Sequence, residues 1–121
     1  MILWPSIDRP CLEGGGAALL AGYHRAIRRL RPGDRHQYAL YSQIFSLAQA
    51  YRFDDGGRIV LEDAHMKHAG LSDRAKFVGL GDSFELWDPA AHAQMADGLR
   101  DLAREGLMKL DPFGEDGEGG A

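Results

Sequence analysis

The sequence of 121 residues predicts one small mixed α+β domain, and three observations support this prediction. Short runs rich in β-branched and aromatic residues alternate with Asp-Gly and Gly-Gly turns in the middle of the chain. Apolar residues recur at helical spacing on both sides of these runs. Hydrophobic residues make up 45% of the chain, which is enough for a modest core. We therefore expect a β core with flanking amphipathic helices.

Two amphipathic helices are predicted in the first half of the chain. The first covers residues 17–30, where apolar side chains share one stripe and the arginines fall largely on the other face. Pro32 and Gly33 break this helix. Asp34 can cap a second helix, which is expected to run into a strand near residues 48–53. These helices would form a helical hairpin ahead of the central strands.

The central part of the chain predicts two strand hairpins separated by a short helix. The predicted segments are a hairpin of residues 51–53 and 59–61, a helix of residues 63–69, and a hairpin of residues 76–80 and 83–87. Asp54 and the glycines that follow it tolerate the backbone angles of a tight reversal. Gly70 is expected to stop the helix.

A C-terminal helix is predicted after Asp88, which serves as N-cap, with Pro89 at the first helical position. Its apolar stripe consists of Met95, Leu99 and Leu102. Its solvent face carries two pairs at i,i+3 spacing, Asp97 with Arg100 and Asp101 with Arg104. The Gly-rich acidic residues 111–121 predict a disordered tail.

Composition narrows the possible functions. The formal net charge of −4 gives no general affinity for nucleic acid, yet five arginines cluster between Arg25 and Arg35. The single Cys11 cannot form an internal disulfide. No apolar run has the length of a membrane span, and no signal peptide is recognisable. We therefore expect a cytoplasmic protein without a membrane partner.

Several of these segments occur together in one known order. They are a D-x-x-G-R motif at Asp54, Gly57 and Arg58, the IVL that follows it, HAGL at residues 68–71, FVGLGDSFELWD at residues 77–88, and ILWPSIDRPCLEG near the start. In this combination the chain resembles the MraZ family of bacterial transcription regulators. The resemblance implies a swapped-hairpin β core of the SpoVT/AbrB type, sequence-specific binding to promoter DNA, and assembly into closed rings. It also implies control of the division and cell-wall gene cluster, at the nucleoid.

A weak internal repeat suggests how the chain is organised. ILWPSIDRPCLEG echoes KFVGLGDSFELWD, so that Asp8 matches Asp82 and Leu12 matches Leu86. Residues 1–46 are accordingly expected to be a remnant of a first repeat, and residues 47–110 a second repeat with the C-terminal helix. The family carries two D-x-x-G-R motifs and this chain carries one, so we expect a truncated gene or a misassigned start. Unpaired strand edges would then favour a dimer or higher assembly.

The resemblance makes Arg58 the candidate DNA contact, with its guanidinium on a phosphate or a guanine edge. Asp54 would brace the turn, and Gly57 would permit it. Family motifs often place a basic residue where this chain has Gly56, so affinity should suffer. Further candidate phosphate contacts are Arg52, Arg25, Arg28 and Arg29. Spacing alone also allows ordinary roles: a surface ion pair for Arg58, and a solvated helix face for the other arginines.

Three alternatives remain. The chain could be a self-associating module that has lost its affinity for DNA. GLGDSFEL resembles the nucleophile block of GDS-type esterases, with Ser83 as nucleophile, but Asp88 and His92 have the wrong spacing for its partners. His65 and His68 lack a third metal ligand, so surface histidines and no metal or cofactor are expected.

The side chains expected in the core or an interface are Trp4, Leu12, Phe77, Phe84, Leu86 and Trp87, the last beneath the C-terminal helix.

Overall fold

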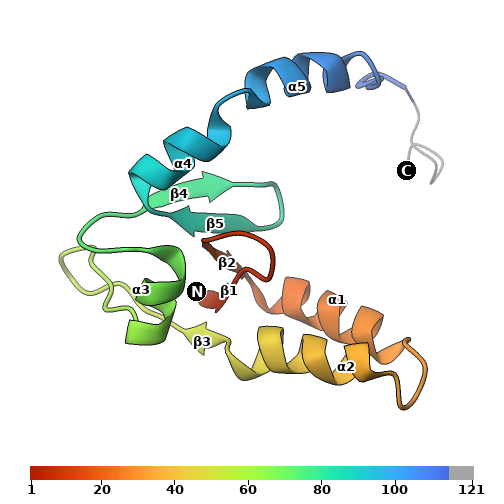
Figure 1. Ribbon diagram of the computed structural model, residues 1–121, viewed down its shortest axis with the longest axis vertical. Helices are drawn as coiled ribbons and strands as arrows, with labels where there is room; N and C mark the ends of the chain where they lie inside the picture. The colour runs from red at the N-terminus through yellow and green to blue at the C-terminus, as the bar shows by residue number, and fades with distance from the viewer. Residues whose placement is uncertain (115–121) are drawn as a thin grey trace.

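Five short antiparallel strands form a sheet in the order β3-β1-β2-β5-β4 (Figure 1). The computed structural model describes residues 1–114. The strands are β1 (Ile2–Pro5), β2 (Leu12–Gly15), β3 (Gln49–Ala50), β4 (Lys76–Gly79) and β5 (Phe84–Trp87). The helices are α1 (Ala17–Arg28), α2 (Arg35–Leu40), α3 (Asp63–Ala69), α4 (Pro89–Ala96) and α5 (Leu99–Leu107), with a π-helical segment, η1 (Tyr41–Ser46), after α2. The predicted α+β class is confirmed.

The sheet consists of two hairpins, β1–β2 and β4–β5, joined along β2 and β5. The residue offset that relates Asp8 to Asp82 in the internal repeat also maps β1 onto β4. Leu12 and Leu86, which are equivalent in the two copies, face each other in the β2–β5 register. A local two-fold axis therefore passes through this pair of leucines.

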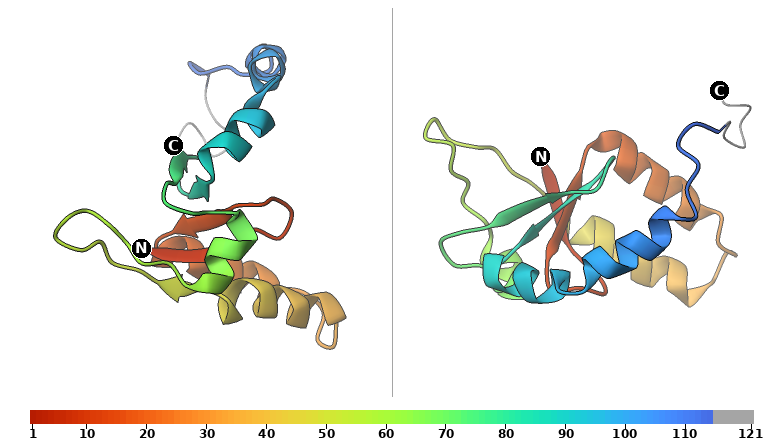
Figure 2. Two further views of the ribbon diagram at one scale, coloured as in Figure 1. Left: turned by 60° about the vertical axis from the view of Figure 1, so that its left-hand side comes forward. Right: turned by 90° about the horizontal axis from the view of Figure 1, so that it is seen from above.

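The two faces of the sheet are covered by different helices, as the alternation of side chains along a strand requires. Leu3 points to one face and packs in a cluster beneath α3. Trp4 points to the other face and packs against α1, α2 and η1. Figure 2 shows α3 and the α1–α2 pair on different sides of the strands. The helical hairpin predicted before the central strands is therefore present.

The predicted strands at residues 51–53 and 59–61 do not form. Strand β3 contains two residues, and the Tyr51 amide extends its pairing by one bond of 2.7 Å to the Met1 carbonyl. Beyond Tyr51 the chain leaves the edge of β1, so residues 52–62 have no neighbouring strand within residues 1–114. A strand needs a partner for its backbone groups. The segment is therefore a loop whose backbone groups are satisfied by local bonds, by side chains or by solvent.

Helix ends also differ from the prediction. Helix α1 stops at Arg28 instead of residue 30, and Leu30 closes a tighter turn onto the Ile27 carbonyl. The predicted C-terminal helix is broken into α4 and α5, because Gly98 takes a left-handed conformation with φ of 86°. Helix α5 extends away from the sheet, and Leu99 and Leu102 are exposed (Figure 1). The predicted apolar stripe is therefore not a buried face.

Other local predictions are confirmed. The Asp88 carboxylate accepts a bond of 3.0 Å from the Ala91 amide and caps α4, with Pro89 at its start. Trp87 is buried and packs edge-on against His92 of α4. Gly70 ends α3. Arg104 bonds Asp101 at 3.2 Å, whereas Asp97 and Arg100 form no ion pair within residues 1–114.

Most of the predicted core is also buried, with one exception. Trp4, Leu12, Leu86 and Trp87 are buried, and Phe84 is partly buried. Phe77 lies on the outer strand β4 and is 50% exposed, so it does not belong to the core, and its alternative place in an interface stays a prediction.

The tail prediction falls largely outside the described residues, since it covers residues 111–121. Within the described part, Gly114 donates a backbone bond to the Asp111 carbonyl and closes a turn. No helix in residues 1–114 has the length and apolar character needed to cross a membrane.

A polar cluster connects the two hairpins on the face opposite α3. Glu85 of β5 is buried and accepts a bond of 2.8 Å from the Trp87 indole. Its second carboxylate oxygen lies 2.7 Å from the guanidinium of Arg9, which belongs to the β1–β2 turn. Burial, followed by the Glu85 charge, raises the pKa of Cys11 to about 11, so this thiol stays neutral at pH 7.

We expect Arg9→Ala to lower the free energy of unfolding by about 1–3 kcal/mol, because Glu85 loses its counter-charge in a buried position. The measurement is urea-induced unfolding at neutral pH. Arg104→Ala is the matched control, since it removes an arginine from an exposed pair that should contribute less than about 1 kcal/mol. Equal losses in the two variants would contradict a structural role for the Arg9–Glu85 pair.

Candidate nucleic-acid interface

The D-x-x-G-R motif lies in the loop of residues 52–62, which projects from the β3 edge of the sheet (Figure 1). Asp54 organises the turn. Its Oδ1 accepts bonds of 2.9 Å from the Gly56 amide and 2.8 Å from the Arg58 amide. Its own amide donates to the Arg58 carbonyl at 2.7 Å. Hydrogen bonds to the Asp54 side chain therefore brace this turn, in place of the hydrogen bonds that paired strands would form.

Gly57 occupies the left-handed region with φ of 76°. A residue with a Cβ is disfavoured there by roughly 1 kcal/mol. The amide of Gly57 also donates to the Asp54 carbonyl at 3.0 Å. The sequence requirement for glycine at this position therefore comes from the backbone of the turn.

Arg58 extends into solvent from this turn, with its side chain 83% exposed. Its Nε lies 3.6 Å from Asp54 Oδ2, so the ion pair considered from spacing alone is present but loose and solvated. A Cβ built on Gly56 would lie 3.2 Å from an Arg58 guanidinium nitrogen, so the guanidinium lies over the glycine. Most guanidinium donors remain available to an external acceptor.

The other candidate arginines divide into two groups. Arg52 and Arg58 line the same shallow groove of about 360 Å³ beside β3. Arg25 and Arg28 on α1 and Arg29 at its C-cap are exposed, as predicted, but α1 lies away from the loop in both Figure 1 and Figure 2. The structure therefore brings Arg52 to Arg58 and leaves the α1 arginines on a separate surface.

The sequence did not predict that His65 holds the base of the loop. His65 was expected at the surface, and it is 3% exposed. It contacts the hydroxyl of Tyr51, at the start of the loop, at 2.8 Å from Nδ1. Burial raises the pKa of Tyr51, so its phenol keeps its proton. The available signal was the i,i+4 spacing of His65 and Ala69, which places both residues on the inner face of α3.

The enzyme and metal alternatives find no support in the geometry. Ser83 lies in the β4–β5 turn, and Asp88 uses its carboxylate to cap α4. His92 packs against Trp87 and forms no hydrogen bond to Ser83 within residues 1–114. Over that same range, no three His, Cys, Asp or Glu side chains gather in a way that could hold a metal ion.

Comparison with known proteins identifies the relatives of this chain. A family model described as "MraZ protein, putative antitoxin-like" matches residues 44–108, which include the loop and the β4–β5 hairpin. A transcriptional regulator MraZ of Phenylobacterium zucineum is 38% identical over 107 residues, or 88% of this chain and 67% of that protein. The same regulator of Caulobacter vibrioides is 39% identical, with 88% and 69% covered. That of Rickettsia rickettsii is 34% identical over 110 residues, with 91% and 74% covered.

Because Asp54 braces the turn, substitutions of Asp54 and of the adjacent Asp55 should affect hydrogen exchange in the turn differently. Asp54→Ala should speed hydrogen exchange at the Gly56 and Arg58 amides about fivefold or more, because each loses an acceptor worth roughly 1 kcal/mol. The measurement is amide exchange followed by NMR. Asp55→Ala is the matched control. It removes the same charge from the adjacent residue, and Asp55 accepts none of the turn's hydrogen bonds. Similar exchange in both variants would show that charge, and not the brace, holds the turn.

Proposed function

The chain belongs to the MraZ family of transcriptional regulators, and we propose that it regulates transcription by binding double-stranded DNA through the loop of residues 52–62. The observation that carries this proposal is the exposed position of the Arg58 side chain. The side chain extends from a braced turn at the edge of the molecule, with most of its guanidinium donors available. A planar guanidinium can donate two parallel bonds to a guanine edge or to phosphate.

Local charge makes a single loop a weak binder. Arg52 and Arg58 supply two positive charges, and Asp54, Asp55 and Glu62 oppose them with three negative charges. Gly56 adds no positive charge where family motifs often have a basic residue. Affinity for DNA rises with the number of phosphates neutralised, so one loop is expected to bind weakly and several loops in one assembly to bind well.

The regulated genes follow from the family resemblance. We assign the protein to the promoter of the division and cell-wall gene cluster, with the swapped-hairpin arrangement as the scaffold of the loop. Strand β3 of the second half pairs with β1 of the first half, which is the kind of exchange that a swapped-hairpin core requires. A promoter-bound protein of this type would be found at the nucleoid.

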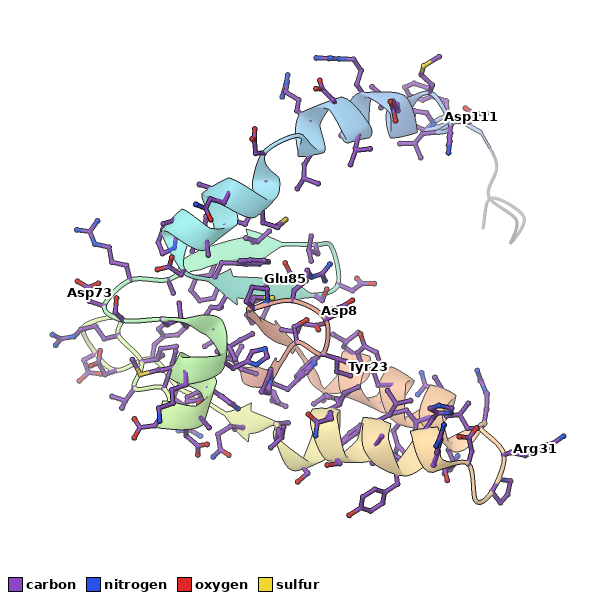
Figure 3. The ribbon with its side chains drawn as sticks, viewed as in Figure 1. Asp8, Tyr23, Arg31, Asp73, Glu85 and Asp111 are labelled. Atoms are coloured by element: carbon purple, nitrogen blue, oxygen red, sulfur yellow. The ribbon has the colours of Figure 1, made fainter. Side chains whose placement is uncertain are left out.

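We expect Arg58→Ala to abolish specific binding to the promoter duplex of its own operon, since it removes the base-reading group. Binding is measured by fluorescence anisotropy at two salt concentrations, with a shuffled duplex for comparison. The matched control is Arg31→Ala, an equal change of charge at the α1–α2 turn, far from the loop (Figure 3).

Each result has a defined meaning. Specific, salt-sensitive binding that is lost in Arg58→Ala and kept in Arg31→Ala supports the proposal. Equal weak binding of the wild-type chain to promoter and shuffled duplexes contradicts it and favours the self-association alternative. Equal losses in the two variants would assign the binding to general positive charge and not to the loop.

A second candidate function, self-association, is favoured by the open edge of β4. The internal repeat aligns Phe77 with Leu3 in the sequence. Leu3 is 0% exposed on the inner strand β1, whereas Phe77 on the edge strand β4 is 50% exposed. The rings of Phe53, Phe77 and Phe84 stack beside this edge. We propose that a second copy of the chain covers the edge and this aromatic patch, by strand pairing and apolar burial.

Phe77→Asp should shift the chain toward monomer in sedimentation velocity measured over a range of concentrations, because a buried carboxylate at the contact is unfavourable. Phe113→Asp is the control, since Phe113 is an exposed phenylalanine that follows α5 in the chain. A wild-type chain that stays monomeric at all concentrations, or equal effects of both variants, would exclude the β4 edge as the contact.

A further inference from the structure

Three segments of the chain meet at the base of the DNA-binding loop, at one buried histidine. Nε2 of His65 lies 2.9 Å from the carbonyl of Leu47, at the end of η1. Nδ1 of His65 lies 2.8 Å from the hydroxyl of Tyr51, where the loop begins. That hydroxyl accepts a bond of 3.0 Å from the Glu62 amide, where the loop ends. The histidine side chain therefore connects η1 with both ends of the loop.

The hydrogen positions in this network follow from its donors and acceptors. The Leu47 carbonyl can only accept, so Nε2 carries the ring proton. Nδ1 is then unprotonated and accepts a hydrogen bond from the Tyr51 hydroxyl. The oxygen of that hydroxyl keeps a lone pair for the Glu62 amide. Every polar group of the network is satisfied, which is the condition for burying it without a large loss of stability.

The geometry points to His65 and Tyr51 as the positioning residues that fix the DNA-binding loop relative to the sheet. Within residues 1–114 the loop has no strand partner, and hydrogen bonds within residues 54–58 brace its turn. Those bonds set the shape of the tip and cannot set its direction. Ile59 and Leu61 are partly buried against the core and guide the returning half of the loop. Tyr51 fixes the positions of both ends through one hydroxyl group.

This inference rests on the proposed function, because it concerns how Arg58 reaches a base edge. A bidentate contact tolerates little displacement, whereas contact with the phosphate backbone tolerates more. Loosening the base of the loop should therefore reduce binding to the specific duplex more than binding to a shuffled one. A purely stabilising contact would not change this ratio.

The experiment compares four variants with the wild-type chain. Tyr51→Phe and His65→Leu each remove part of the network while keeping an apolar side chain of similar size. His65→Gln carries an acceptor and a donor on one planar group, so it can replace both ring nitrogens. Ile27→Ala lowers stability from the cluster on the other face of the sheet and leaves the network intact.

Two measurements are made, the amide NMR spectrum of the free protein and the ratio of specific to shuffled affinity. We expect Tyr51→Phe and His65→Leu to shift the amide resonances of residues 52–61 and to reduce the ratio about tenfold, the loss of one buried hydrogen bond to a fixed group. His65→Gln should restore at least half of this loss, measured on the logarithm of the affinity ratio. Ile27→Ala should leave the amide resonances of residues 52–61 and the affinity ratio unchanged.

The two measurements separate this inference from the proposed function. Loop resonances that stay unchanged in Tyr51→Phe and His65→Leu overturn the positioning role, whatever the affinity does. Loop resonances that shift while the wild-type chain shows no specific binding leave the positioning role standing and overturn the DNA-binding proposal. A ratio that falls equally in Ile27→Ala assigns the effect to general stability and overturns the positioning role in DNA binding.

Discussion

The pairing of β2 with β5 is the contact on which the rest of the structure depends, because it alone joins the two hairpins into one sheet. The pair formed by Leu12 and Leu86 lies at the centre of this contact and is buried beneath α3. The Arg9–Glu85 pair holds the same junction from the opposite face. Two different forces, apolar burial and charge pairing, therefore act on one line of contact between the repeats.

The position of the loop of residues 52–62 at the edge of the sheet determines how it is held. The loop leaves the sheet at its outer edge, after the bond between the Tyr51 amide and the Met1 carbonyl. Apolar burial holds it only in part, since Ile59 and Leu61 are partly buried against the core whereas Val60 is exposed. Hydrogen bonds from side chains add to this contact: Asp54 at the tip, and Tyr51 with His65 at the base. A loop that must reach a ligand is commonly built in this way on a rigid scaffold.

Local sequence signals predicted most of the fold, and non-local contacts account for the errors. The α4 cap at Asp88, the end of α3 at Gly70 and the β4–β5 hairpin depend on neighbouring residues, and all three were correct. The strands expected at residues 51–53 and 59–61 needed a partner that local pattern cannot supply. The burial of His65 was missed for the same reason, since its partner Leu47 is distant in the sequence. For the candidate site, the motif predicted the turn at Asp54 and Gly57, whereas its support at Tyr51 came only from the structure.

The two-fold axis relates the two proposed activities of the chain. The loop emerges beside β1, and the axis carries that position to the open edge of β4. A segment bound at β4 in the equivalent way would present a second loop at the symmetric position on the same sheet. Assembly at β4 would then do more than cover Phe77, because it would raise the number of arginines facing one duplex. Weak binding by one loop and association at the open edge are, on this geometry, two parts of one mechanism.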